Sequence, residues 1–187
     1  MLDRQKIMNA IKNYFCFLTF IFLQTIIISS VEGREDSFAK MGVVPSKNEK
    51  LAPGFTLETP TGEKLSLKDF KGKTILLHFW ATWCVPCKKE LPTIQKVYEA
   101  LNPNDFEVIA ISIDRNNTEN VRKYIKDYNL TFTVLLDQNQ NVRKDYFILG
   151  LPTSYLIGAD GNLKGFISGA REWNSDASKE MLSTLMH

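Results

Sequence analysis

Residues 80–92, WATWCVPCKKELP, decide the fold because they join a buried strand to a helix through a Cys-x-x-C pair. The strand is the apolar run TILLHFW at residues 74–80, which is typical of a central strand covered on both faces. A helix is expected from about residue 84 to residue 101. Cys84 then lies at the helix N-terminus, and Cys87 lies one turn further along the same face.

The position of Cys84 predicts its chemistry. Free amide N–H groups and the helix dipole favour an anion at a helix N-terminus, so the pKa of this thiol should fall and Cys84 should act as a thiolate nucleophile. Cys87 is expected to be the deeper, resolving thiol. Pro86 donates no N–H and presets the helical φ, so it stiffens the first turn without losing a bond. Because so short a loop makes a poor structural staple, the pair is predicted to be a redox-active disulfide.

Composition argues against several other kinds of site. The third cysteine, Cys16, lies inside an apolar run. A zinc site would need further ligands, and the only histidines are His78, within the strand, and His187, at the C-terminus. The formal net charge is +2, with no basic stripe of the kind that binds nucleic acid. No metal, other cofactor or nucleic-acid partner is therefore predicted.

Residues 1–33 combine a basic start, the apolar run YFCFLTFIFLQTIII at residues 14–28, and small residues after it. This pattern predicts a signal sequence. Without cleavage, residues 11–31 reach the ~20 residues that a single transmembrane anchor requires; a buried core helix is the third alternative. The N-terminal cations place that end in the cytoplasm, so the protein is expected on the periplasmic face of the cytoplasmic membrane, or secreted if cleaved. Residues 34–51 are polar and are predicted to be a flexible tether.

The folded domain is expected at residues 52–187. Strand and helix patterns alternate along it and end in a hairpin and a helix, which predicts an α/β fold with a central mixed β-sheet flanked by helices. Asp160-Gly161 between two apolar runs is a strong hairpin signal. The expected strands are 55–58, 64–67, 74–80, 106–113, 132–136, 154–157 and 163–168, and the expected helices are 84–101, 118–128, 139–147 and 174–186.

The chain resembles the thioredoxin superfamily, and more closely its TlpA/ResA/CcmG-like branch of membrane-anchored proteins. The resemblance covers about residues 51–187. It rests on APGFTLETPTGEKLSLKDFKGK at residues 52–73, on WATWCVPCKKELP, and on GLPTSYLIGADG at residues 150–161. It implies a thioredoxin fold with an N-terminal β-hairpin and a central strand–helix insertion, which the segment 118–136 matches.

The resemblance also implies a substrate-binding surface. Pro152 corresponds to a cis-proline that faces the disulfide, although a trans turn proline is the alternative that the residues alone allow. The backbone of Leu151 would pair with the substrate chain as an added strand. Trp83 and Pro86, beside the cysteines, are expected to contact the substrate as well.

Glu90 lies three residues after Cys87 on the same helix face, and the resemblance implies that it tunes the acidity of the thiols. Partial burial would raise its pKa and let it exchange a proton with Cys87; a solvated surface carboxylate is the alternative. The pattern also departs from cytoplasmic thioredoxin. His78 stands where that group has a buried Asp, and Ala110 stands where it has a Lys. His78 is therefore either a core histidine or a substitute base.

The predicted function is extracytoplasmic thiol–disulfide exchange that reduces disulfides of specific proteins, such as those of cytochrome c maturation. The implied partners are protein thiols and disulfides and a membrane thiol transporter as electron donor, and the chain is expected to be a monomer. One alternative is a peroxiredoxin-like peroxidase, whose P-x-x-x-T-x-x-C motif would need Pro and Thr where Leu77 and Ala81 stand. Another is a non-catalytic binding domain with a silent disulfide. Val85 and Pro86 do not fix the direction of exchange.

Overall fold

The computed structural model describes residues 36–48, 50–101 and 103–186. The predicted signal or anchor segment, residues 1–33, lies outside the described residues, and so does the candidate span at residues 11–31. Among the described residues, no helix has both the length and the apolar character to cross a membrane. The described residues from 38 to 186 form one folded unit.

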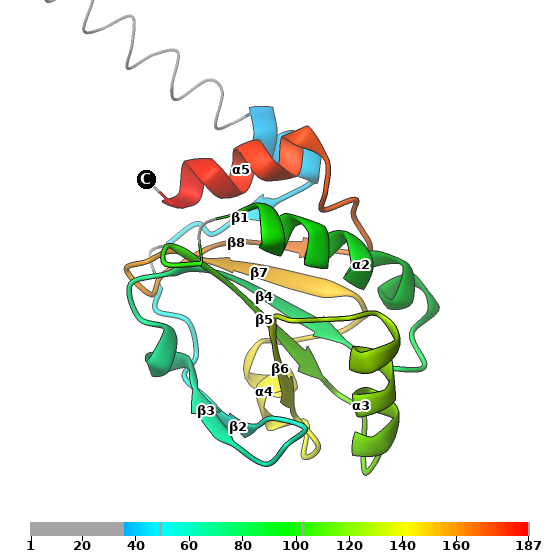
Figure 1. Ribbon diagram of the computed structural model, residues 1–187. Helices are drawn as coiled ribbons and strands as arrows, with labels where there is room; N and C mark the ends of the chain where they lie inside the picture. Colours follow the sequence, from blue (N-terminus) through cyan, green and yellow to red (C-terminus); the bar gives the residue numbers. More distant parts are fainter. Residues whose placement is uncertain (1–35, 49, 102, 187) are drawn as a thin grey trace, which may run out of the picture. The chain divides into compact units, whose positions relative to one another are not determined.

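A mixed sheet forms the centre of this unit, with strand order β1-β8-β7-β4-β5-β6-β2-β3 (Figure 1). The three strands β4, β5 and β6 run parallel, and every other neighbouring pair is antiparallel. This is the mixed sheet that the sequence predicts. The strands are β1 (Val44–Pro45), β2 (Thr56–Glu58), β3 (Lys64–Ser66), β4 (Thr74–Trp80), β5 (Phe106–Ser112), β6 (Thr133–Leu136), β7 (Thr153–Ile157) and β8 (Leu163–Ser168).

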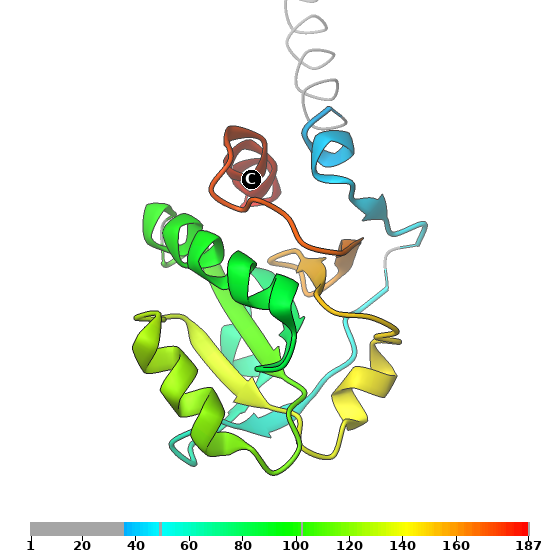
Figure 2. The same cartoon turned by 90° about the vertical axis from the view of Figure 1, so that its right-hand side faces the viewer.

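Helices cover both faces of the sheet (Figure 2). Side chains alternate along β4, so its residues report which helix lies on which face. The Trp80 ring lies 5.4 Å from that of Tyr124 in α3, whereas the Phe79 ring lies 5.4 Å from that of Tyr146, directly after α4. Helices α2, α3 and α5 thus share one face, and α4 covers the other. The helices are η1 (Leu67–Phe70), α2 (Val85–Ala100), α3 (Thr118–Asp127), α4 (Asn141–Asp145) and α5 (Asp176–Met186).

Strands β4 and β5 form the core of the sheet, and every residue in both is buried. They pair in parallel register from Thr74 opposite Phe106 to Trp80 opposite Ser112. Their carboxyl ends therefore lie side by side, and the loops that follow both strands meet at one edge of the sheet. In open α/β sheets this edge is where functional sites are built.

The two predicted hairpins and the predicted insertion are all present. β2 pairs with β3, and β7 pairs with β8. The insertion consists of α3 and β6, which adds a strand beside β5 and receives β2 through Glu58 opposite Leu136. The Arg122 guanidinium of α3 donates to the carbonyl oxygen of Pro60 at 2.8 and 2.6 Å, so the turn of the first hairpin is tied to the insertion.

The predicted tether is wrong for residues 38–45, because the fold begins before residue 52. Met41 and Val43 are buried in the core, and β1 pairs with β8 as the edge strand of the sheet. Gly165 permits this close approach, since a Cβ there would stand 2.8 Å from the Val44 carbonyl oxygen. Pro45 is acceptable on such an edge, where its missing N–H breaks no ladder. Two buried side chains in a polar segment are too few to produce a periodic signal.

Candidate active site

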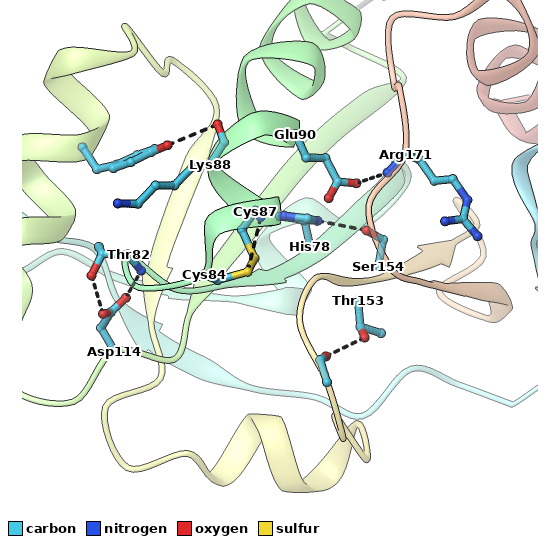
Figure 3. The surroundings of a disulfide bond; sticks show 12 residues. His78, Thr82, Cys84, Cys87, Lys88, Glu90, Asp114, Thr153, Ser154 and Arg171 are labelled. Atoms are coloured by element: carbon cyan, nitrogen blue, oxygen red, sulfur yellow. Dashed lines mark hydrogen bonds between the residues drawn. A yellow bond between two sulfur atoms is a disulfide. The ribbon is translucent and has the colours of Figure 1, made fainter.

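Cys84 and Cys87 form a disulfide at the N-terminus of α2, with their Cα atoms 5.3 Å apart (Figure 3). Cys84 is the N-cap residue in an extended conformation, and its Sγ accepts a hydrogen bond from the Cys87 N–H at 3.3 Å. Cys84 is 5% exposed, whereas Cys87 is fully buried. The predicted difference in depth between the two sulfurs is therefore present, and an amide donor points at the outer one.

A buried carboxylate fixes the loop that carries Cys84. Asp114, two residues beyond the end of β5, accepts from the Thr82 N–H at 2.8 Å and from the Thr82 hydroxyl at 2.7 Å (Figure 3). It also accepts from the Ser112 hydroxyl at 2.8 Å. This contact was not predicted from the sequence. A signal was available, because Asp114 and Thr82 each follow a parallel strand and the ends of such strands are neighbours.

Helix α2 continues through Pro92, which has no N–H for the carbonyl oxygen of Lys88. The Tyr124 hydroxyl of α3 donates to that oxygen at 3.2 Å and replaces the missing helix bond. The Lys88 ammonium lies 5.8 Å from the centroid of the same ring. The insertion thus supports the turn of α2 that follows the disulfide.

Glu90 lies one turn beyond Cys87 and is only 2% exposed, so it is not a solvated surface carboxylate. Its Oε1 accepts from the Trp173 indole N–H and from the Arg171 backbone N–H, while Oε2 has no partner among the described residues. Burial raises the pKa of Glu90 to about 7, although both hydrogen bonds and the charge of Arg171 lower it. Trp173 and Arg171 were missed because they lie 83 and 81 residues away in the chain.

His78 is fully buried on the face of β4 that it shares with Trp80, which is the face covered by α2. Its Nδ1 lies 2.9 Å from the Ser154 hydroxyl oxygen and shares a hydrogen bond with it, and its Nε2 has no partner in the described part of the chain. Desolvation lowers the pKa of His78 to about 3. A group with this pKa accepts a proton poorly near neutral pH, so the complete burial of His78 and its low pKa favour a core histidine over a base.

The peptide bond between Leu151 and Pro152 is cis, as the resemblance implied. Thr153 pairs with Phe79, so the Leu151–Pro152 segment lies beside the end of β4, where the disulfide loop begins. The Pro152 carbonyl oxygen accepts from the Gly169 N–H at 2.9 Å. Within the described residues, neither the N–H nor the carbonyl oxygen of Leu151 has a backbone partner. An open stretch of backbone thus lies beside the start of the loop that leads to the disulfide.

Trp83 and Pro86 are both exposed beside Cys84 and are free to meet another molecule. Leu77 and Ala81 are fully buried. These are the two positions that a peroxidase motif would fill with Pro and Thr. The site therefore contains a thiol pair, a buried acid and an open backbone segment, which together suit thiol–disulfide exchange rather than peroxide reduction.

Comparison with known proteins agrees with this chemistry. The model of the AhpC/TSA family matches residues 49–166. The thiol-disulfide oxidoreductase ResA of Bacillus cereus is 40% identical over an alignment of 129 residues that covers 66% of this chain and 74% of that protein.

Two solved structures share the fold. The thioredoxin domain of a thiol-disulfide oxidoreductase from Bacteroides vulgatus is 27% identical with a TM-score of 0.65, covering 76% of this chain and 100% of that one. A thiol:disulfide interchange protein of the thioredoxin family from Chlorobium tepidum is 28% identical with a TM-score of 0.67, and the match covers 76% of this chain and 99% of that one.

Proposed function

We propose that this chain, which belongs to the AhpC/TSA family and is a thiol–disulfide oxidoreductase of thioredoxin fold, works outside the cytoplasm as a reductant of protein disulfides. The observation that carries the proposal is the hydrogen bond from the Cys87 N–H to the Cys84 Sγ at the start of α2. In the reduced protein this amide and the helix dipole favour a thiolate on Cys84. Cys84 is accordingly the nucleophile and Cys87 the resolving thiol.

The reaction transfers two electrons from the protein dithiol to the substrate disulfide. The Cys84 thiolate attacks one substrate sulfur, the substrate S–S bond breaks, and a mixed disulfide forms as the first substrate thiolate leaves and takes up a proton. Cys87 then loses its proton and attacks the Cys84 Sγ. The second substrate thiolate leaves and is protonated, and the protein is left with the Cys84–Cys87 disulfide.

Glu90 is suited to accept the proton that Cys87 must lose. It lies on the same helix face one turn away, and its pKa of about 7 allows both protonation states near neutral pH. Its Oε2 has no partner within the described residues and is the oxygen free to take the proton. His78, with a pKa of about 3, stays neutral throughout and acts as part of the packed core.

The proposal includes an extended protein substrate and a location outside the cytoplasm. An extended substrate chain would add to the open backbone at Leu151, with Trp83, Pro86 and Pro152 in contact with it. Residues 1–33 would direct the domain out of the cytoplasm, as a cleaved signal or as an anchor through residues 11–31. A monomer in this position would receive electrons from a membrane thiol transporter and pass them to specific proteins such as apocytochrome c.

The direction of exchange is tested by the equilibrium potential of the Cys84–Cys87 couple. The domain would be equilibrated with dithiothreitol buffers, and its free thiols trapped and counted. We expect a potential nearer to that of thioredoxin, about −270 mV, than to that of the oxidant DsbA, about −120 mV. A value near the DsbA end would show that the protein donates disulfides and would overturn the proposed direction.

A further inference from the structure

We propose that Arg171 is a positioning residue that ties the N-terminal segment of the domain to the buried acid of the active site. Residues 38–43 hold the Arg171 side chain, and the backbone at Arg171 helps to enclose Glu90 beside Cys87. The inference rests on the proposed function and adds a part to its proton-transfer site. A stretch that the sequence predicts to be a flexible tether thus shapes the surroundings of the reacting thiols.

The link between β8 and α5 runs past Glu90, and we call residues 169–175 the strap. The Arg171 N–H donates to the Glu90 Oε1 at 3.3 Å, and the Trp173 indole N–H donates to the same oxygen. The Trp173 backbone N–H donates to the Thr93 hydroxyl oxygen of α2 at 3.1 Å, and the Trp173 side chain is fully buried. The strap contains no helix or strand, so these contacts fix its course over the carboxylate.

The Arg171 side chain turns away from Glu90 and binds the N-terminal segment. Figure 3 shows the backbone N–H facing the carboxylate and the guanidinium directed away from it. The guanidinium donates through Nε to the Met41 carbonyl oxygen at 2.8 Å and through Nη1 to the Ala170 carbonyl oxygen at 2.9 Å. The Ser175 hydroxyl donates to the Met41 Sδ at 3.9 Å. One residue therefore contacts the acid with its backbone and the N-terminal segment with its side chain.

Gly42 leaves the room that this guanidinium occupies. Its φ is +66°, which favours glycine, and a Cβ there would stand 2.7 Å from the Arg171 Nη2. The segment is itself held in place, because Met41 is only 4% exposed and the Gly42 N–H donates to the Ala39 carbonyl oxygen at 2.9 Å. A side chain at position 42 would displace the guanidinium while leaving its charge intact.

The ionisable groups around Glu90 allow position to be separated from charge. Among the described residues, Arg171 is the one whose charge acts on Glu90; it lowers the pKa, whereas burial has the larger effect and raises it. His78 on β4 is neutral above its pKa of about 3, and Cys87 on α2 does not titrate in the disulfide. If the strap is released while the cation is kept, water reaches Glu90 and its pKa falls toward the ordinary value of 4.5.

The test is Gly42→Ala in the full-length, oxidised protein. The Trp173 indole N–H resonance, assigned with Trp173→Phe, reports the protonation of Glu90 through their hydrogen bond and needs no turnover. Its titration midpoint, at about pH 7 in the wild type, should fall by roughly one pH unit in the variant. Gly42→Ala/Arg171→Lys should return the midpoint toward that of the wild type, because lysine keeps a cation and a donor for Met41 but lacks Nη2.

Gly62→Ala is the matched control, since Gly62 also has a left-handed φ, +95°, but no atom lies within 4 Å of a Cβ there. It should keep the wild-type midpoint. Gly42→Asn repeats the displacement with a residue that tolerates left-handed φ, and it replaces the alanine variant if that protein does not fold.

Three results would overturn the role of Arg171: an unchanged or raised midpoint in the folded Gly42 variant, an equal shift in Gly62→Ala, or a midpoint that stays low in the double variant. Failure of the proposed function gives a different result. In that case the midpoint falls as expected in Gly42→Ala, but the wild type reduces no protein disulfide.

Discussion

The two sides of the disulfide have opposite chemistry. On the outer side, next to Cys84, the side chains of Trp83 and Val85 are apolar and exposed. On the inner side, next to Cys87, two ionisable side chains, Glu90 and His78, are buried. This is the reverse of the usual distribution, in which apolar groups are inside and ionisable groups outside.

The two sides are suited to different steps of the exchange reaction. The outer side offers surface that a polypeptide can cover, whereas the inner side contains the carboxyl group suited to accept the proton that Cys87 must release. The inner side is itself divided, because burial moves the pKa of an acid up and that of a base down. The pKa of Glu90 rises to about 7 and that of His78 falls to about 3, so both tend toward their neutral forms.

The largest expected effect comes from Cys84→Ser, which removes the atom where the two sides meet. We expect reduction of insulin to fall to the uncatalysed rate. The fold should remain, because the change removes little volume and serine is itself a good N-cap residue. Far-ultraviolet circular dichroism compared with the reduced wild type checks the fold. Turnover above background would mean that another group attacks the substrate.

The next effect separates the two buried ionisable groups by their influence on stability. Glu90→Gln should lose stability relative to wild type on acidification from pH 6.5 to 4.5, whereas His78→Asn should gain stability over the same range. The difference in free energy of unfolding between each variant and the wild type should change by roughly 1.4 kcal/mol per pH unit. Urea unfolding at several pH values measures both. Parallel pH dependences for the wild type and both variants would show that neither group is perturbed in the folded protein.

The signs follow from the direction of each shift. The pKa of Glu90 rises from 4.5 to about 7 on folding, so between these values the folded state holds the extra proton and stability falls as pH rises. The pKa of His78 falls from 6.5 to about 3, so the unfolded state holds the extra proton and stability rises with pH. In the wild type these two slopes oppose each other between pH 4.5 and 6.5. Each substitution exposes the slope of the remaining group.

A smaller effect is expected on the exchange rate of the Glu90→Gln variant. Loss of the carboxylate that takes the Cys87 proton should slow resolution by about tenfold near neutral pH. This is less than the roughly 100-fold or more that is typical of general acid–base catalysis, because a thiol also ionises in part without a base. Alkylation of the two thiols followed across pH should show a shifted profile as well. The matched comparison is Glu99→Gln, an exposed carboxylate on the same helix. Superimposable curves for wild type and Glu90→Gln would make Glu90 a structural residue only.

Much of the fold was predicted from local patterns. The apolar run at residues 74–80 indicated a central strand, Asp160-Gly161 indicated the last hairpin, and Cys84 with Pro86 indicated the start of a helix. Each of these signals depends on residues within a few positions of one another, because buried strands, tight turns and helix caps have local physical requirements. The sequence by itself therefore determined the strand–disulfide–helix unit and the thiol chemistry that it supports.

Only the tertiary structure decided the environment of that unit. Trp80 and Trp83 are three residues apart in one motif, yet the first is fully buried and the second is exposed. Glu90 is enclosed by Trp173, which lies 83 residues away, and the loop before Cys84 is fixed by Asp114, which follows another strand. Burial and pKa depend on what distant segments place around a side chain, and no local pattern carries that information. The sequence thus determined which atoms react, whereas packing decided which side receives the substrate and which side holds the proton.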